Sequence, residues 1–99
     1  MLSKRFFKTK EETEVTFEFA HPGADKVALV AEFNDWQPVP MTFVKKDRVF
    51  RAKTRLPKDR LFHFRYLIND EKWENDYQAD AYQPNCFGSE DSVVDTSNH

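Results

Sequence analysis

The sequence predicts an all-β fold: an antiparallel β-sandwich of immunoglobulin-like type with about seven strands. Three observations support this prediction. Apolar residues alternate with polar ones over several segments, which is the period of a half-buried strand. Between these segments lie turns rich in Pro, Asn, Asp and Lys. We find no convincing amphipathic helix. A small closed barrel of the OB type is the alternative fold.

The first half of the chain holds three expected strands. In residues 14–19 every second residue is apolar, and the residues between them are Thr and Glu. After a turn at 21–25 that contains Pro and Gly, residues 26–33 repeat this alternation with Val, Leu, Ala and Phe. The polar run 34–38 ends that strand, and residues 41–44 form a third, short candidate.

The second half alternates more sharply. Residues 49–56 set Phe, Ala, Thr and Leu against Arg, Lys and Arg, and residues 61–68 follow after a turn. A polar turn at 69–72 and a long polar stretch at 74–90 precede a last strand near 92–96. The predicted core consists of Phe17, Phe19, Val27, Leu29, Phe50, Phe62, Phe64 and Tyr66.

Composition limits the class of protein. The chain of 99 residues suits a single domain, 1–99, and its 39% apolar and 15% aromatic residues argue against disorder. Fifteen Lys and Arg against seventeen Asp and Glu give a net charge of −2, so we expect no nucleic-acid partner. No apolar run approaches the ~20 residues of a membrane span. We therefore expect no membrane partner. The single cysteine, Cys86, cannot form an internal disulfide, so we expect a cytoplasmic protein.

Two tryptophans stand in polar turns directly after expected strands. Trp36 follows the strand at 26–33, and Trp73 follows the strand at 61–68. A buried indole is the plainer interpretation of each. An exposed indole offers a broad apolar face and an N–H donor, which suits a sugar ring. Arg65 alternates with core residues near Trp73, so its donors should face outward, where they can bind sugar oxygens.

The order of four segments resembles carbohydrate-binding module family 48. These segments are Glu32–Pro38, Phe64–Ile68, Trp73 and Phe87–Val94, and the resemblance covers about residues 14–95. This family is the isoamylase early-set domain, found also as the glycogen-binding domain in the β subunit of AMP-activated protein kinase. The resemblance implies an immunoglobulin-like sandwich of early-set type that binds α-1,4-glucans such as glycogen, starch or maltooligosaccharides.

The resemblance also implies the carbohydrate-binding residues. The family's two stacking tryptophans match Trp36 and Trp73, its basic sugar-contacting residue matches Arg65, and its apolar residue against the sugar ring matches Phe87. Its asparagine that bonds sugar hydroxyls matches Asp91, a departure that removes the amide donor but leaves two acceptor oxygens. The turn before Trp73 is also one residue longer than in the kinase subunit, which affects how Trp73 is aimed.

We expect no catalysis, metal or cofactor. In this family the module often precedes the catalytic barrel of branching and debranching enzymes, and 99 residues leave no room for that barrel. A glycoside hydrolase label by homology would therefore not imply activity. The three histidines and Cys86 show no metal-ligand spacing and no nucleophile motif.

Three functions remain open from sequence. The leading one is a non-catalytic α-glucan-binding module, whose protein partner could be a glycogen-metabolising enzyme. The second is a protein-interaction module that kept the sandwich and lost the sugar site, a hypothesis motivated by Asp91. The third, single-stranded nucleic-acid binding, rests on a basic face expected from Arg51, Lys53, Arg55, His63 and Arg65 beside aromatic residues. Exposure of both Trp36 and Trp73 on one side favours the first over the second.

Overall fold

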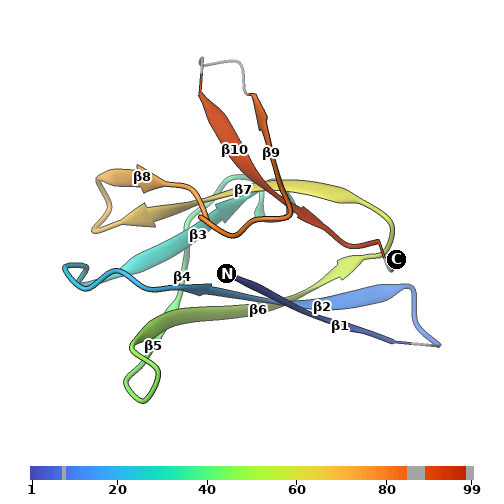
Figure 1. Ribbon diagram of the computed structural model, residues 1–99, viewed down its shortest axis with the longest axis horizontal. Helices are drawn as coiled ribbons and strands as arrows, with labels where there is room; N and C mark the ends of the chain where they lie inside the picture. Colours follow the sequence, from blue (N-terminus) through green and yellow to red (C-terminus); the bar gives the residue numbers. More distant parts are fainter. Residues whose placement is uncertain (8, 85–88, 98–99) are drawn as a thin grey trace.

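The computed structural model describes residues 1–7, 9–84 and 89–97. These residues form two antiparallel sheets that pack as a sandwich, and a single turn of 3-10 helix, η1 (Glu32–Asn34), interrupts them (Figure 1). This arrangement confirms the all-β sandwich expected from the alternating pattern. Within the same residues, no helix is long and apolar enough to cross a membrane.

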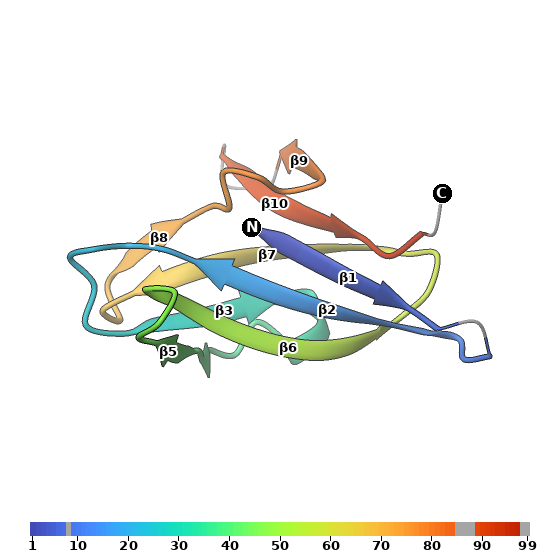
Figure 2. The ribbon, with the colours of Figure 1, turned by 60° about the horizontal axis from the view of Figure 1, so that its bottom comes forward.

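One sheet has four strands in the order β1-β2-β6-β5. Their bounds are Leu2–Phe6 for β1, Glu12–Phe19 for β2, Thr42–Val44 for β5 and Val49–Pro57 for β6. β2 and β6 pair along their whole length, from Glu12 opposite Pro57 to Phe19 opposite Phe50. Figure 2 shows this sheet lying in front of the other layer.

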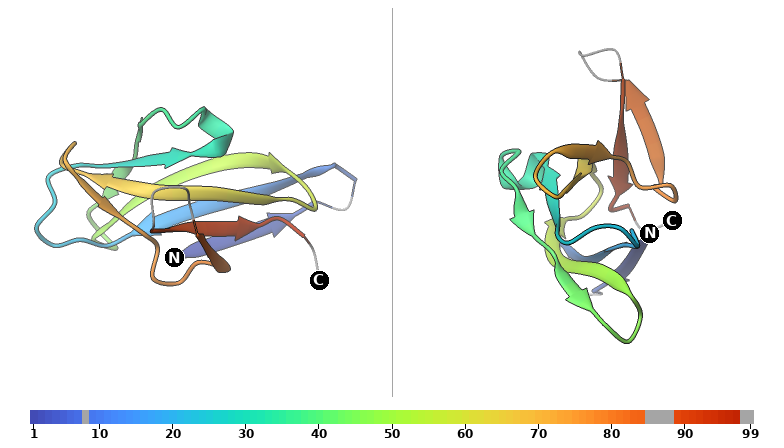
Figure 3. Two further views of the ribbon diagram at one scale, coloured as in Figure 1. Left: turned by 90° about the horizontal axis from the view of Figure 1, so that it is seen from above. Right: turned by 90° about the vertical axis from the view of Figure 1, so that its left-hand side faces the viewer.

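The second sheet has six strands, in the order β4-β3-β7-β10-β9, with β8 paired to β7. Their bounds are Val27–Ala31 for β3, Val39–Pro40 for β4, Leu61–Ile68 for β7, Lys72–Glu74 for β8, Ala81–Pro84 for β9 and Glu90–Asp95 for β10. The pair β9 and β10 projects away from the body of the sandwich (Figure 3). Because β3 occupies one edge of β7, β8 and β10 both pair with the other edge: β10 with residues 61–64 and β8 with residues 66–68.

The core lies between the sheets, where the period-two pattern predicted it. In β2 every second residue is buried, and in β7 Phe64 and Tyr66 are buried. The aromatic rings interlock: Phe17 meets Phe64 edge to face with centroids 5.0 Å apart. Of the eight predicted core residues seven are buried, and the remaining one, Phe62, packs half-buried against them. Each such side chain contributes about 1.5–3 kcal/mol through removal of apolar surface from water.

The structure has more strands than the sequence predicted. The described residues contain ten, and β1, β4, β8 and β9 have no counterpart among the expected strands. β1 was missed because none of its side chains is fully buried, so its apolar signal is weak. β4, β8 and β9 are two, three and four residues long, too short for periodicity to reveal.

Candidate functional site

The outer face of the six-stranded sheet carries most of the candidate residues. Because Phe64 and Tyr66 of β7 point into the core, the alternate residues His63, Arg65 and Leu67 point outward. On β3, Ala28 stands opposite Leu67 and Val30 opposite Arg65. Ala28, Val30 and Leu67 are buried and form a second, small apolar cluster away from the main core. This face is therefore apolar in the middle and polar toward β10.

Trp73 extends this apolar surface at the sheet edge. It stands opposite Leu67 in the β7–β8 pair, so its indole lies on the outer side, and 51% of the residue remains exposed. The turn before it uses Asn69 and Asp70, both in the left-handed region with φ of 51° and 60°. Two such residues in succession are the signature of a tight turn that matches the twist of a hairpin.

Trp36 is held by a compact turn at the end of β3. Its backbone N–H donates to the carbonyl of Ala31 at 2.8 Å. The side chain of Asn34 braces the same turn, since its Oδ1 accepts from the N–H of Ala31 at 2.9 Å and its Nδ2 donates to the carbonyl of Leu29. Asp35 and Trp36 both have a left-handed backbone, with φ of 58° and 57°. Trp36 is 45% exposed.

A left-handed backbone at a tryptophan is strained. For L-residues this conformation costs roughly 1–2 kcal/mol, and bulky side chains adopt it rarely. Such strain persists only where the surrounding structure imposes it, and it concentrates at functional positions. Here the strain coincides with an indole that is left half exposed instead of being folded into the core.

Arg65 lies beside Trp73 in a network with β10. Its Nη2 donates to the hydroxyl of Ser89 at 2.6 Å and to the carbonyl of Glu90 at 2.9 Å. Its Nε lies 2.8 Å from Oδ1 of Asp91. A small hollow of about 190 Å³ opens here, lined by Arg65, Trp73, Glu74, Asn75, Ser89 and Glu90.

Asp91 is a buried member of this network. Only 7% of the residue is exposed, and its Oδ2 lies 3.1 Å from Nδ1 of His63. The other ring nitrogen of His63 lies 3.1 Å from Oε1 of Gln83 on β9. Asp91 thus faces two basic side chains inside the sheet surface. It does not line the hollow.

Of the five site residues expected from the sequence, three lie together, one lies apart from them, and one is outside the described residues. Trp73 and Arg65 meet at the hollow, and Asp91 joins them from beneath through Arg65. Trp36 belongs to the same sheet but lies at the far end of β3. Phe87 lies outside the described residues.

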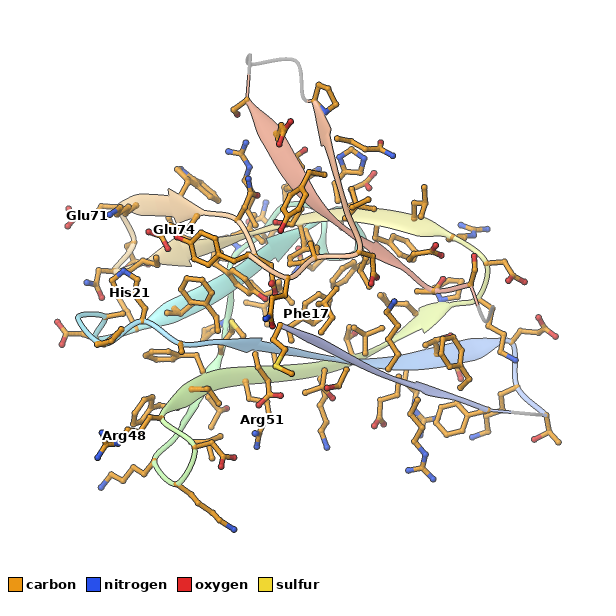
Figure 4. The ribbon with its side chains drawn as sticks, in the orientation of Figure 1. Phe17, His21, Arg48, Arg51, Glu71 and Glu74 are labelled. Carbon is orange, nitrogen blue, oxygen red and sulfur yellow. The ribbon has the colours of Figure 1, made fainter. Side chains whose placement is uncertain are left out.

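The single basic face expected from sequence is wrong. Arg51, Lys53 and Arg55 belong to β6 in the four-stranded sheet, whereas His63 and Arg65 belong to β7 in the other sheet. Figure 4 shows Arg51 pointing away from the core on the opposite side from β7 and β8. Alternation identified these residues as outward-facing, but it carries no information about which sheet a strand joins.

Two residues of this region escaped sequence reasoning. Asn75 lines the hollow, donates to the carbonyl of Glu90 at 2.8 Å and accepts from the hydroxyl of Ser92 at 2.9 Å. Asp76, only 1% exposed, accepts a hydrogen bond from the Tyr66 hydroxyl at 2.7 Å. Both lie in a long polar stretch of the sequence, where no pattern distinguishes a buried, hydrogen-bonded polar side chain from one that is exposed to solvent.

No model of a known protein family matches this chain, and no curated protein matches it either.

Proposed function

We propose that this protein is a non-catalytic module that binds α-1,4-glucans through Trp36 and Trp73. The observation that carries the proposal is the pair of half-exposed indoles on one sheet, Trp36 in the turn after β3 and Trp73 in the edge strand β8. A buried position for either would have removed one platform. Stacking on an indole suits a pyranose because its C–H face is apolar and its rim is polar.

The hollow beside Trp73 supplies polar groups for the rim of such a ring. Arg65, Glu74, Asn75, Ser89 and Glu90 line it together with Trp73, and the carbonyl of Glu90 accepts from both Arg65 and Asn75. Acceptors and donors at one edge of an apolar platform fix the orientation of a ligand that is bound mainly by stacking. This mixture of groups, with its acidic members, favours a neutral sugar over an anionic one.

The strain at Trp36 supports the same proposal. The chain turns Trp36 outward at an energetic cost, although Phe33 three residues earlier packs against the core. A residue selected only for stability would gain by folding its indole inward, because burial of so large an apolar surface is favourable. Binding of a ligand to the exposed face explains why the cost is tolerated.

Protein interaction on the same sandwich is the second candidate. The observation in its favour is that the Asp91 carboxylate faces Arg65 and His63, not the solvent. The set of sugar contacts implied by the resemblance to carbohydrate-binding module family 48 is therefore incomplete at this position. Loss of a sugar contact with retention of the fold is what an interaction module would show.

Titration of maltoheptaose into wild type, Trp36→Ala and Trp73→Ala tests the proposal. We expect wild-type dissociation constants of ~10 μM to 1 mM, and loss of measurable binding in either variant, because a stacking platform contributes ~1–3 kcal/mol. Tyr77→Ala is the matched control, since it removes an aromatic side chain that is 78% exposed elsewhere. Circular dichroism confirms that each variant is folded.

The outcomes separate the two candidates. If both tryptophan variants bind maltoheptaose like wild type, the platforms are misassigned. If folded wild type binds no glucan, protein interaction becomes the better proposal.

A further inference from the structure

We infer that Asp91 is a positioning residue: it holds the guanidinium of Arg65 beside Trp73 and does not itself contact the sugar. The inference deepens the proposed function and rests on it. It differs from the role that the resemblance implies, in which the residue at this position bonds sugar hydroxyls directly.

The sheet register brings Asp91 to Arg65. In the β7–β10 pair Ser92 stands opposite Phe64 and Val93 opposite His63. Continued by one residue, this register sets Asp91 opposite Arg65 on the outer face. The two side chains are therefore neighbours because of strand pairing, and the 2.8 Å separation of Nε and Oδ1 follows from it.

Burial requires Asp91 to have charged partners. A carboxylate removed from water is stable only when it is paired and hydrogen-bonded. Each of its oxygens has a basic neighbour, Arg65 on one side and His63 on the other. Gln83 in turn contacts the His63 ring, so the carboxylate is held from β7 and β9 together.

Arg65 is in consequence fixed in one orientation. Its guanidinium contacts Asp91 through Nε, and Ser89 and the Glu90 carbonyl through Nη2. A free arginine side chain carries large rotamer entropy, which a ligand would have to remove on binding. Because the protein has already removed it, the guanidinium can bind sugar oxygens at lower cost.

Arg65 and Asp91 occupy different positions relative to the hollow, and this difference gives them different roles. Arg65 lines the hollow with Trp73, whereas Asp91 lies outside the lining and is almost fully buried. Substitution of Asp91 should therefore alter glucan binding only through Arg65.

The test compares wild type, Asp91→Asn, Arg65→Gln and the double variant by maltoheptaose titration. Asp91→Asn keeps the shape of the side chain but removes its charge and converts one acceptor oxygen into a donor amide. That amide opposes a donor of Arg65 or His63, so we expect binding to weaken by roughly threefold to tenfold. Within the Arg65→Gln background the same change should have no further effect.

Opposite results would overturn the inference. If Asp91 touched the sugar, Asp91→Asn would restore the amide donor that the resembled family uses, and binding would tighten. Independent effects that multiply in the double variant would also contradict it. Asp95→Asn is the matched control, because it makes the same chemical change four residues along β10 and away from the hollow.

Two further measurements keep the inference testable. If Asp91→Asn does not fold, as thermal unfolding would show, His63→Gln loosens Asp91 from its other side and should weaken binding only when Arg65 is present. The Nη–H resonances of Arg65 in nuclear magnetic resonance spectra should show slow rotation of the guanidinium in wild type, where Nη2 donates to Ser89 and to the Glu90 carbonyl, and fast rotation in Asp91→Asn. Absence of wild-type binding would refute the proposed function, whereas normal binding by Asp91→Asn would refute this inference alone.

Discussion

Single residues in this protein carry charge into the core and must be compensated there. Asp76 is the clearest case, because it is buried yet receives the Tyr66 hydroxyl and the backbone N–H of Gln78 at 2.8 Å. Burial raises the pKa of Tyr66 well above its usual range, and the Asp76 carboxylate raises it further. The pair links β7 to the segment between β8 and β9.

Tyr66→Phe should lower the free energy of unfolding by about 1–3 kcal/mol, because it removes a donor to a buried carboxylate. Urea unfolding at neutral pH measures the change. Tyr77→Phe is the control: its hydroxyl lies at the surface, 3.5 Å from a Glu74 oxygen, and its loss should change stability by less than about 0.5 kcal/mol. Equal effects of the two substitutions would contradict the role of Asp76.

The raised pKa of Tyr66 also predicts a dependence on pH. In the unfolded chain tyrosine loses its proton near pH 10, whereas in the folded protein Tyr66 holds its proton to higher pH. The contribution of Tyr66 to the free energy of unfolding is therefore fully present below about pH 10. Above that pH it declines by up to ~1.4 kcal/mol per pH unit. The stability difference between wild type and Tyr66→Phe should thus shrink between about pH 10 and 11. A constant difference would contradict this prediction.

At the scale of elements, the hairpin of β7 and β8 decides where Trp73 lies. Asn69 serves it twice: its backbone adopts the left-handed turn, and its Oδ1 accepts from the N–H groups of Asp25 and Lys26 at 2.9 and 3.1 Å. These bonds tie the β2–β3 connection to the β7–β8 turn. The added residue noted in the sequence is therefore part of an anchored turn.

Variants of this turn separate its two contributions. Asn69→Gly keeps the backbone conformation and loses only the side-chain bonds, so we expect a loss of about 1–2 kcal/mol in unfolding free energy. Asn69→Ala adds the left-handed strain and should lose about 2–4 kcal/mol. Asp70→Gly is the control, expected near zero, because its ion pair with Lys26 is exposed at the surface. Identical losses in the Gly and Ala variants of Asn69 would show that backbone strain is unimportant here.

The sequence predicted the elements with strong alternation and missed those whose contacts are long-range. Phe17 and Phe64 lie in eight-residue strands, where alternation gives the buried face directly. β9 and the Asp76 network depend on pairing with β10, which no local pattern encodes. Of the site, the assignment of Trp36 to a turn was correct, whereas Trp73 was expected in a turn and lies in the short strand β8. The Arg65–Asp91–His63 contacts could not be derived, because they require the register of β7 and β10.

At the scale of the whole molecule, strand pairing places basic side chains of one strand opposite acidic side chains of its neighbour. The basic row of β6 faces the acidic row of β2: Arg55 stands opposite Glu14, and Arg51 opposite Glu18 with a 2.6 Å ion pair. Hydrogen bonds that Arg51 donates to the carboxylates of Glu18 and Asp47 raise the pKa of Arg51 above its usual range. The two arginines of this row, Arg51 and Arg55, therefore have carboxylate partners within the same sheet or its adjoining turn.

If the proposed function is correct, the separation of the two tryptophans makes affinity depend on the length of the glucan. Trp36 is bonded to Ala31 at the end of β3, whereas Trp73 is level with Ala28 and lies two strands away. Three residues along a strand and two strand spacings separate their backbones by roughly 14 Å. One sugar ring cannot reach both platforms from that distance, but an oligosaccharide can, and its second contact forms at high effective concentration.

Maltoheptaose should therefore bind at least about tenfold more tightly than maltose, and Trp36→Ala should remove this advantage because its binding of maltoheptaose falls below measurement. Because the proposed ligand is neutral, affinity should change less than about twofold between about 50 and 500 mM NaCl. Calorimetric titration of both sugars at both salt concentrations measures these effects. Equal affinities for the two sugars would mean that a single platform binds the ligand. A steep fall with salt would instead indicate an anionic ligand, because only a charged partner loses affinity as its counterions become more concentrated.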